Sequence, residues 1–408
     1  MNCRHCAAPL ALSMIDLGSA PPSNAYLTEA SLHGPELWLP LKVLVCTHCW
    51  LAQTEDTSGT EHLFDDDYAY FSSFSDSWLA HSKRYVAEMQ ERFSLDSKSL
   101  VVEIAANDGY LLQYVQARGI PCLGIEPTAS TAAAARAKGI DVVEAFFGVR
   151  LAEQLAAQGK RAKLTAANNV LAHVPDINDF VAGFAILLDP SGVATFEFPH
   201  LLQLIAENQF DTIYHEHFSY LSLTAVDRIF SSHGLSVFDV EEIPTHGGSL
   251  RVFAQRADAA QHTRTSRVAA MLSREESAGM QQPEFYAEVQ AHANRIKYAL
   301  LEFLINAKRS GKKVGAYGAA AKGNTLLNYS GIRPDLLPWV VDRNPAKQGK
   351  YLPGSRIPIV DESRLRAERP DYVLILPWNL ADEVMTQLDY IRQWQGQFVS
   401  AVPELRIR

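Results

Sequence analysis

Several absences limit what this 408-residue chain can be. Its five cysteines are too few for a disulfide-stapled secreted domain. No apolar run reaches the ~18 residues of a membrane-spanning helix, so we expect no membrane partner. Acidic residues outnumber basic ones, giving a formal net charge of −9, and no basic cluster stands out. We therefore expect no nucleic-acid partner, because binding phosphates requires clustered Lys and Arg.

Two further signals are missing. The start, MNCRHCAAPL, lacks the basic segment and apolar core of a secretion signal, so we expect a cytoplasmic protein, which we take to be monomeric. Neither a G-x-G-x-x-G fingerprint nor a Walker motif marks the glycine-containing turns, which argues against dinucleotide binding and ATP hydrolysis.

Four of the cysteines form two C-x-x-C pairs: Cys3, Cys6, Cys46 and Cys49. Paired thiolates at this spacing suit a tetrahedral Zn²⁺, and four of them fill its coordination shell, which predicts a structural metal. The gap between the pairs is longer than in compact zinc ribbons, and His5 or His48 could replace a thiolate. The alternative is four ordinary reduced cysteines.

The rest of the chain alternates between strand and helix patterns. Apolar runs from Leu100 to Pro199 predict a mostly parallel sheet covered by helices, followed by an antiparallel pair near residues 235–256. A polar helical connector precedes a second alternation. We therefore predict an α/β protein with a zinc-binding module at 1–65, a Rossmann-like domain at 66–258, and at 259–408 the connector plus a second Rossmann-like domain.

Acids end the first two predicted strands of the middle domain. Glu103 precedes a loop ending in Asn-Asp-Gly, and Glu126, which could bind a ribose diol, follows the second strand. Small residues before a helix let a ligand approach the backbone. This pattern is that of S-adenosylmethionine methyltransferases, although another nucleotide, or no ligand, remains an alternative. Asn168, Asn169 and His173 follow the fourth strand, at the edge where ligands bind.

The segment IYHEHF, residues 213–218, places four proton-carrying side chains in a row. Histidine suits proton transfer because its pKa lies near working pH. In a strand, His215 and His217 would point the same way and could share a metal. Plain structural histidines are the third interpretation.

The whole chain resembles the sugar C-methyltransferases that act on nucleotide-linked 4-keto-deoxysugars. The matching segments follow the family's order over nearly the full length: CRHC with CTHC, YAYFSSFSDSW, VEIAANDGYLL, NNVLAHV, YHEHFSYLS, HGGSLRVF and GAYGAAAKGNTLLN. One departure is Ala105-Ala106, where the family usually has Gly-Ser. The alanines are small enough to keep the loop but remove a hydroxyl contact.

The resemblance implies methyl transfer from S-adenosylmethionine to a ring carbon beside a keto group, through an enolate made by a base. The methylated carbon would be C-3, with C-5 as the alternative, and the sugar would be linked to thymidine or guanosine diphosphate. It also implies His217 as the base, with Tyr214 and Glu216 beside it. Tyr214 or His173 would donate to the developing oxyanion.

The expected binding residues form two sets. The cofactor set is Tyr68, Tyr70, Glu103, Ala105, Asn107, Asp108, Gly109, Glu126, Asn168 and Asn169; in the family the stretch with the two tyrosines closes over the cofactor. The substrate set is His246, Gly248, Ser249, Arg251, Tyr317, Lys322 and Asn324. Ser249, Arg251, Lys322 and Asn324 can donate to phosphate oxygens. Other interpretations are a methyltransferase for a different small molecule, an inert C-terminal domain, and a zinc-ribbon sensor without catalysis.

Overall fold

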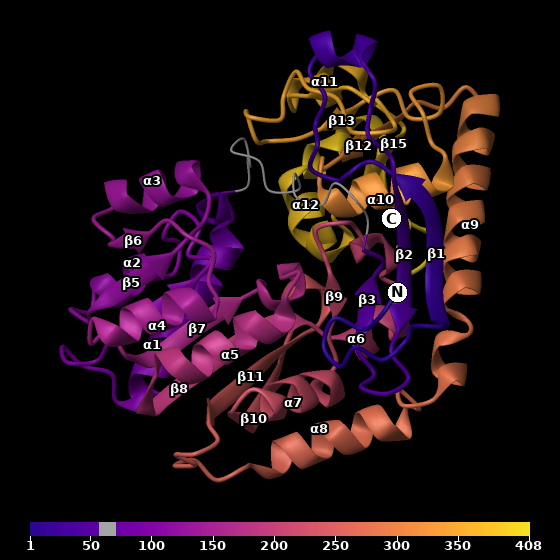
Figure 1. The fold of residues 1–408 in the computed structure, drawn as a ribbon. Helices are drawn as coiled ribbons and strands as arrows, with labels where there is room; N and C mark the ends of the chain where they lie inside the picture. Colours follow the sequence, from indigo (N-terminus) through magenta and orange to yellow (C-terminus); the bar gives the residue numbers. More distant parts are fainter. Residues whose placement is uncertain (57–70) are drawn as a thin grey trace.

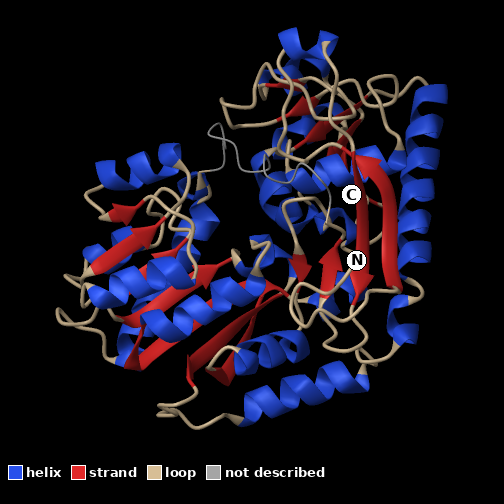
Figure 2. Cartoon of the chain, viewed as in Figure 1, coloured by secondary structure: helices blue, strands red, loops and turns tan. Residues whose placement is uncertain are grey.

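The computed structural model describes residues 1–56 and 71–408, and the structural statements below refer to these residues. They form three sheets, with helices packed against the strands (Figures 1 and 2). The α/β architecture predicted from the sequence is confirmed. Within the described part of the chain, the longest helices are too polar to cross a bilayer.

The N-terminal sheet has the order β1-β2-β3-β9 and antiparallel pairing throughout. Its strands are β1 (Leu12–Ala20), β2 (Leu39–Val45), β3 (Ala52–Thr54) and β9 (Ser219–Tyr220). The first three flank the cysteine knuckles, whereas β9 comes from the middle of the chain. The N-terminal module is therefore completed by residues that are more than 160 positions away in sequence.

The middle sheet has the order β10-β11-β8-β7-β4-β5-β6. Its strands are β4 (Val101–Ile104), β5 (Cys122–Ile125), β6 (Val142–Val143), β7 (Ala162–Asn168), β8 (Leu188–Pro199), β10 (Leu235–Ile243) and β11 (Ser249–Arg256). β4 to β8 are parallel, while β10 and β11 are antiparallel. All four residues of β4 are buried, as expected of a strand covered on both faces.

Seven α-helices accompany the described part of this domain: α1 (Asp76–Phe93), α2 (Leu112–Gln116), α3 (Ala129–Ala137), α4 (Val149–Ala157), α5 (Ile177–Leu187), α6 (Leu201–Ala206) and α7 (Leu223–Ser232). Ser75 starts α1 by accepting a hydrogen bond from the Trp78 backbone N–H. Short 3₁₀ turns lie at Ala30–His33, Ser72–Phe74, Leu171–His173, Phe210–Thr212, Thr245–Gly247, Pro283–Tyr286, Trp378–Leu380 and Asp389–Trp394.

The C-terminal sheet has the order β14-β13-β12-β15-β16-β17, parallel except for the last pair. Its strands are β12 (Val314–Tyr317), β13 (Val340–Val341), β14 (Ile359–Val360), β15 (Tyr372–Ile375), β16 (Gln397–Ser400) and β17 (Arg406–Ile407). The helices are α8 (Ser266–Ser277), α9 (Val289–Arg309), α10 (Ala321–Ser330), α11 (Ser363–Glu368) and α12 (Ala381–Gln387).

The N-terminal sheet packs against the C-terminal half of the chain. Helix α9 runs alongside β1 and β2 (Figure 1), and one apolar cluster joins Met14, Ile15 and Val43 to Ile296 and Leu300. The continuous burial means that the N-terminal module is held by hydrophobic contact rather than by a flexible linker.

The connector helix α8 is anchored to the middle domain by a buried carboxylate. Glu275 accepts hydrogen bonds from the backbone N–H groups of Leu223 and Thr224 at 2.7 and 2.8 Å, at the start of α7. Thr224 Oγ1 and His200 Nε2 donate to it as well, at 2.6 and 2.7 Å. Burial opposes its charge, but these donors outweigh burial and lower its pKa. The carboxylate thus joins α8 to the N-terminus of α7.

We expect Glu275→Ala to destabilise the protein by about 3–5 kcal/mol, because it leaves buried donors without an acceptor. The measurement is the urea unfolding midpoint, followed by far-UV circular dichroism. Arg274→Ala is the matched control: it removes an exposed pair with Glu242 and should cost less than ~1 kcal/mol. Equal midpoints for the two variants would contradict the anchoring role.

Candidate active site

A cavity of about 1560 Å³ lies between the middle and C-terminal sheets. Its wall contains Ala105, Glu126 and Asn168 from the carboxyl ends of β4, β5 and β7, and Gly318 and Asp342 from those of β12 and β13. Open α/β sheets bind ligands at these strand ends. The volume exceeds the roughly 300–1,000 Å³ of a site for one small ligand. The cavity can therefore hold two ligands at once, one on each sheet.

The loop after β4 turns sharply because three residues take left-handed backbone conformations. Ala105, Asn107 and Gly109 have φ angles of 58°, 48° and 76°. A Cβ on Gly109 would lie 2.4 Å from Ile140 Cδ1, so glycine is required there. The left-handed conformation of Ala105 costs about 1–2 kcal/mol relative to an ordinary backbone conformation.

Two acids, Glu103 and Glu126, lie next to this loop. Glu103 is fully buried, and burial raises its pKa well above the usual range, with the charge of Glu126 adding to the effect. Glu126 accepts hydrogen bonds from the backbone N–H groups of Asn107 and Thr128, both at 2.9 Å. Each carboxylate oxygen can accept more than one hydrogen bond, so Glu126, on the cavity wall, remains able to bind a hydroxyl.

The end of β7 offers an amide to the cavity. Asn168 is buried, borders the cavity and has no hydrogen-bond partner among the described residues, which indicates a polar ligand. Asn169 Nδ2 lies 3.1 Å from His246 Nε2, and both residues have a φ of 55°. Burial, then the charge of Lys322, lowers the pKa of His246 to about 4. Strain of this kind collects at functional sites.

The expected cofactor residues thus separate into three groups. Ala105, Asn107, Glu126, Asn168 and Asn169 line the cavity. Glu103, Asp108 and Gly109 support the loop from behind, with Asp108 Oδ2 3.3 Å from Lys138 Nζ. Tyr68 and Tyr70 lie outside the described residues.

Three aromatic side chains meet at the centre of the cavity. Tyr214, His217 and His173 all border it. The ring centroids of Tyr214 and His217 are 3.9 Å apart, and those of His173 and His217 are 4.6 Å apart. The sequence separates His173 from the other two by about 40 positions, and the fold brings them together.

Backbone carbonyls fix the tautomers of both imidazoles. His217 Nδ1 lies 2.9 Å from Thr212 O, and His173 Nδ1 lies 2.8 Å from Glu216 O. A carbonyl only accepts, so Nδ1 carries the proton in each neutral ring and the lone pair is on Nε2. Burial, then the neighbouring His173, lowers the pKa of His217 well below its usual value, and burial lowers that of His173 to about 4. The His217 ring is therefore neutral at working pH, with an unprotonated Nε2.

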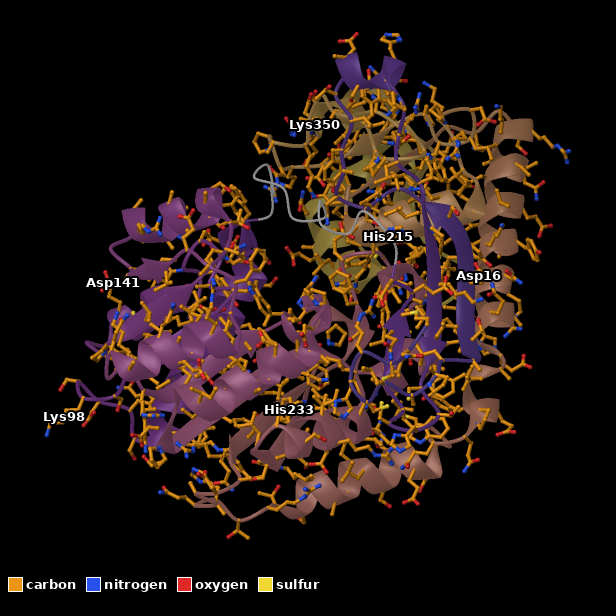
Figure 3. All side chains as sticks on the ribbon, viewed as in Figure 1. Asp16, Lys98, Asp141, His215, His233 and Lys350 are labelled. Carbon is orange, nitrogen blue, oxygen red and sulfur yellow. The ribbon has the colours of Figure 1, made fainter. Side chains whose placement is uncertain are left out.

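The other two residues of the segment turn away from His217. His215 Nε2 lies 3.2 Å from both Leu39 O and Pro40 O, and Figure 3 places it beside the N-terminal strands. Glu216 is buried, and its Oε1 accepts a hydrogen bond from Asn24 Nδ2 at 3.1 Å. Residues 213–218 do not form a strand, so the two histidines diverge and cannot share a metal as a strand would allow.

Lys322 borders the same cavity, at the start of α10. Its Nζ donates to Asn379 Oδ1 at 3.0 Å and lies 4.5 Å from the Trp378 ring centroid. Trp378 Nε1 donates to buried Asp211 at 2.8 Å. Burial raises the pKa of Asp211 to about 7. Burial also lowers the pKa of Lys322 to about 8, although the charge of Asp211 opposes this shift. Because the direct partner of Lys322 is a neutral amide, its charge remains available to an anionic ligand.

Several expected substrate residues have other partners. Arg251 borders the cavity, but its guanidinium binds Glu197 at 2.7 Å, Glu88 at 3.2 Å and Glu241 at 3.3 Å. A phosphate would have to compete with these carboxylates. Ser249 Oγ donates to Thr245 O at 2.9 Å, in the 3₁₀ turn before β11.

Of the remaining residues in the expected substrate set, two contact other parts of the protein and three line the cavity. Asn324 is buried, and its Nδ2 donates to Ser23 O at 2.6 Å, toward the N-terminal loop. A Cβ on Gly248 would lie 3.0 Å from Gln203 Cγ, so Gly248 permits packing within the protein. His246, Tyr317 and Lys322 do line the cavity.

The fold adds residues that the sequence did not single out. Trp78 stacks on His81 with centroids 4.9 Å apart and meets His246 edge-on at 5.4 Å. His81 Nε2 lies 2.8 Å from Glu197, which also binds Arg251. Nothing local marks these residues, because their partners come from different elements. The spacing of Trp78 and His81 within α1 predicts only a shared helix face.

The two cysteine knuckles come together as predicted. The four sulfur atoms all lie within 4.8 Å of one another, and two pairs, Cys3–Cys49 and Cys6–Cys46, are 3.5 Å apart. A tetrahedral ion with ~2.3 Å Zn–S bonds separates its ligands by just under 4 Å, so the set fits Zn²⁺. Hydrogen bonding from Cys49 lowers the pKa of Cys3 to about 4, although burial opposes this. Four thiolates would hold the ion in a purely structural role.

The first cysteine knuckle also contacts the end of the segment 213–218. Arg4, between the first two cysteines, donates from Nη1 to Phe218 O at 2.8 Å and to Thr54 O at 2.9 Å. The Thr54 backbone N–H donates to the same Phe218 carbonyl at 3.1 Å. The metal site is therefore one contact away from the residue that follows His217.

We expect Cys46→Ser to lower bound zinc from one ion per chain to well below one, because a hydroxyl is a poor replacement for a thiolate. Elemental analysis after gel filtration measures this. Cys122→Ser, at a cysteine outside the cluster, should keep its zinc. Full zinc content in the Cys46 variant would contradict the four-sulfur assignment.

Three protein-family models match the chain in succession. A zinc binding domain matches residues 3–64, a methyltransferase domain matches residues 78–240, and the C-terminal domain of C-methyltransferases matches residues 244–403. The first covers the cysteine cluster, the second the β4–β8 strand ends, and the third the Lys322 end of the cavity.

Known proteins agree with these matches. The chain is 36% identical over 406 residues to the C-methyltransferase NovU of Streptomyces niveus, covering 100% of this chain and 96% of that protein. Solved structures are more distant. The magnesium protoporphyrin IX methyltransferase of Synechocystis PCC 6803 with bound SAH has a TM-score of 0.35 at 16% identity, covering 44% of this chain and 83% of that one. An S-adenosylmethionine-dependent methyltransferase of Clostridium acetobutylicum has a TM-score of 0.35 at 10% identity, covering 43% and 90%. The full-length match places this chain among the S-adenosylmethionine-dependent C-methyltransferases that carry an N-terminal zinc-binding domain.

Proposed function

We propose that this enzyme methylates a ring carbon, C-3, beside the 4-keto group of a nucleotide-diphosphate deoxysugar in branched-chain sugar biosynthesis. The observation that carries the proposal is the position of His217, in one cavity between an acid-bearing sheet edge and a lysine-bearing one. S-adenosylmethionine supplies an electrophilic methyl group on a sulfonium. The β4–β5–β7 edge is its proposed site, and the α10 edge is the proposed site of the sugar diphosphate.

His217 is the proposed base. Its Nε2 lone pair takes the proton from the carbon beside the ketone, and the electron pair of the broken C–H bond passes into an enolate. The carbon then forms a bond to the methyl group, and the old sulfur–methyl bond breaks with its electrons on sulfur. Thr212 O assists because it accepts from Nδ1–H and stabilises the imidazolium that forms.

Tyr214 is the proposed donor to the enolate oxygen, rather than His173, because the one N–H of the neutral His173 ring already donates to Glu216 O at 2.8 Å. Tyr214 borders the cavity beside His217, close enough to reach the same substrate carbon and its neighbouring ketone. Donors placed where charge develops contribute most to catalysis. Glu216 is buried and bound by Asn24, so its role is to hold the segment rather than to touch the ketone.

Lys322 is the proposed diphosphate contact. It carries an ammonium into the cavity at the second residue of α10, where the helix N-terminus also favours an anion. Asp342, at the end of β13, borders the same region and receives the Ala319 backbone N–H at 2.7 Å. We assign the nucleotide end of the substrate to this side of the cavity.

The decisive test is incubation with S-adenosylmethionine and a thymidine-diphosphate 4-keto-6-deoxyhexose in heavy water, followed by mass spectrometry. We expect a gain of one methyl group, and NMR of the product should place it on C-3. His217→Ala should slow methylation by about 10²–10⁴-fold, because the general base is lost. The exposed His33→Ala is the matched control and should retain wild-type activity.

The outcomes separate the parts of the proposal. Deuterium uptake without methylation would support proton abstraction beside the ketone and shift attention to the sugar's other substituents. A methyl group on C-5 would correct the position alone. Failure with this sugar, its 3-deoxy form and a guanosine-linked relative would reject a keto-sugar substrate in favour of another small molecule.

The pH dependence should distinguish the two ends of the site. His217 must be unprotonated, and its lowered pKa keeps it so, which should leave kcat/KM constant as pH falls from 7.5 to about 6. Lys322 must be protonated to bind diphosphate, so kcat/KM should fall as pH rises through about 8. Lys322→Arg keeps its charge and should move this alkaline limb upward. An unmoved limb would exclude Lys322 as its source.

A further inference from the structure

We propose that Asn24, on the loop after β1 of the zinc-binding domain, is a substrate contact whose side-chain oxygen accepts a hydrogen bond from a hydroxyl of the nucleotide sugar. This inference rests on the proposed function and adds a residue from a part of the chain that no catalytic assignment has included. Asn24 borders the cavity, whereas the cysteines of its own domain lie at the other end of β1 and β2.

Glu216 fixes the orientation of the Asn24 amide. Asn24 Nδ2 lies 3.1 Å from Glu216 Oε1, and Glu216 is 2% exposed. The NH₂ end of the amide faces Glu216, because Nδ2 is the atom within hydrogen-bond distance of Oε1 and donates to it. Asn24 Oδ1 is then directed away from Glu216, and it has no hydrogen-bond partner among the described residues. Since the half-buried side chain borders the cavity, that oxygen is available to a ligand.

The loop that carries Asn24 is held from both sides. Ser23 O accepts from Asn324 Nδ2 at 2.6 Å, and Tyr26 OH donates to Ala319 O at 2.6 Å. Leu27 pairs with Tyr351 through two backbone hydrogen bonds of 2.9 and 2.8 Å. The C-terminal domain thus fixes the loop on one side and Glu216 fixes it on the other. Because the loop is already ordered, its side chains can position a ligand without the entropic cost of ordering the loop on binding.

The chemistry of an amide oxygen defines its ligand. It accepts but cannot donate, so it repels phosphate oxygens and recognises a hydroxyl or N–H. Asn24 lines the same cavity as Tyr214 and His217. A hydroxyl of the sugar is therefore the donor we assign, and a ribose hydroxyl is the other source of the same chemistry.

The first test compares wild type with Asn24→Ala. We expect KM for the keto-sugar nucleotide to rise about tenfold, since a hydrogen bond is lost, with an unchanged Kd for S-adenosylmethionine by calorimetry. Ala25→Ser, on the exposed neighbour, should change neither. Retained cofactor binding shows that the variant is folded. Calorimetry with thymidine diphosphate alone separates the sources: unchanged affinity assigns the hexose hydroxyl, and weakened affinity assigns the ribose.

The second test, Asn24→Asp, makes a carboxyl pair with Glu216. Two carboxyls in contact hold one proton between them at low pH and repel once both ionise. The variant's kcat/KM, as a fraction of wild type, should therefore fall as pH rises. The facing groups do not titrate here: Tyr26 and Tyr220 have raised pKa values and His173 a lowered one. The alanine variant should lack this trend.

Two results would overturn the inference. One is an alanine variant with wild-type KM and kcat. The other is an aspartate variant whose activity relative to wild type does not depend on pH. If wild type itself fails to react with keto-sugars, the proposed function has failed and the inference falls with it, which the wild-type reaction alone reveals.

Discussion

The position of residues 213–218, which include the proposed base His217, depends on their attachment to the N-terminal sheet. Residues 213–218 form no helix or strand of their own, so their buried backbone groups need partners from elsewhere. β9 pairs with β3, Arg4 binds the Phe218 carbonyl, and His215 binds the carbonyls that open β2. The N-terminal sheet therefore supports the segment that carries His217, the proposed base.

The same backbone fixes the protonation of the site. Thr212 O and Glu216 O set the tautomers of His217 and His173, and these carbonyls lie directly before and within the segment that the N-terminal sheet holds. A shift of this segment would move the base and exchange its hydrogen-bond partner at the same time. The same backbone contacts therefore set both the position of the His217 ring and which of its nitrogens can accept a proton.

The sequence predicts features whose causes are local. Cysteine spacing predicts the cluster, apolar periodicity predicts the strands, and strand ends predict Glu126 and Asn168 at the cavity. The sequence does not predict the orientation of a side chain whose hydrogen-bond partner is distant in the chain. Arg251 and Asn324 resemble phosphate ligands in sequence, yet Glu197 and Ser23 take their donors. Asn24 carries no motif, and only the packing of the N-terminal loop against Glu216 brings it to the cavity.

The two sheet edges that line the cavity carry side chains of opposite charge. Glu126 lines the edge assigned to the cationic cofactor, backed by Asp108 at the loop, while Lys322 lines the edge assigned to the diphosphate. Exchanging the two ligands would place like charges together and cost several kcal/mol. Between these ends, burial keeps the imidazoles neutral, so the charges select the ligands without protonating the base. In the proposed reaction, the neutral centre is what allows a carbon acid to be deprotonated between two charged binding sites.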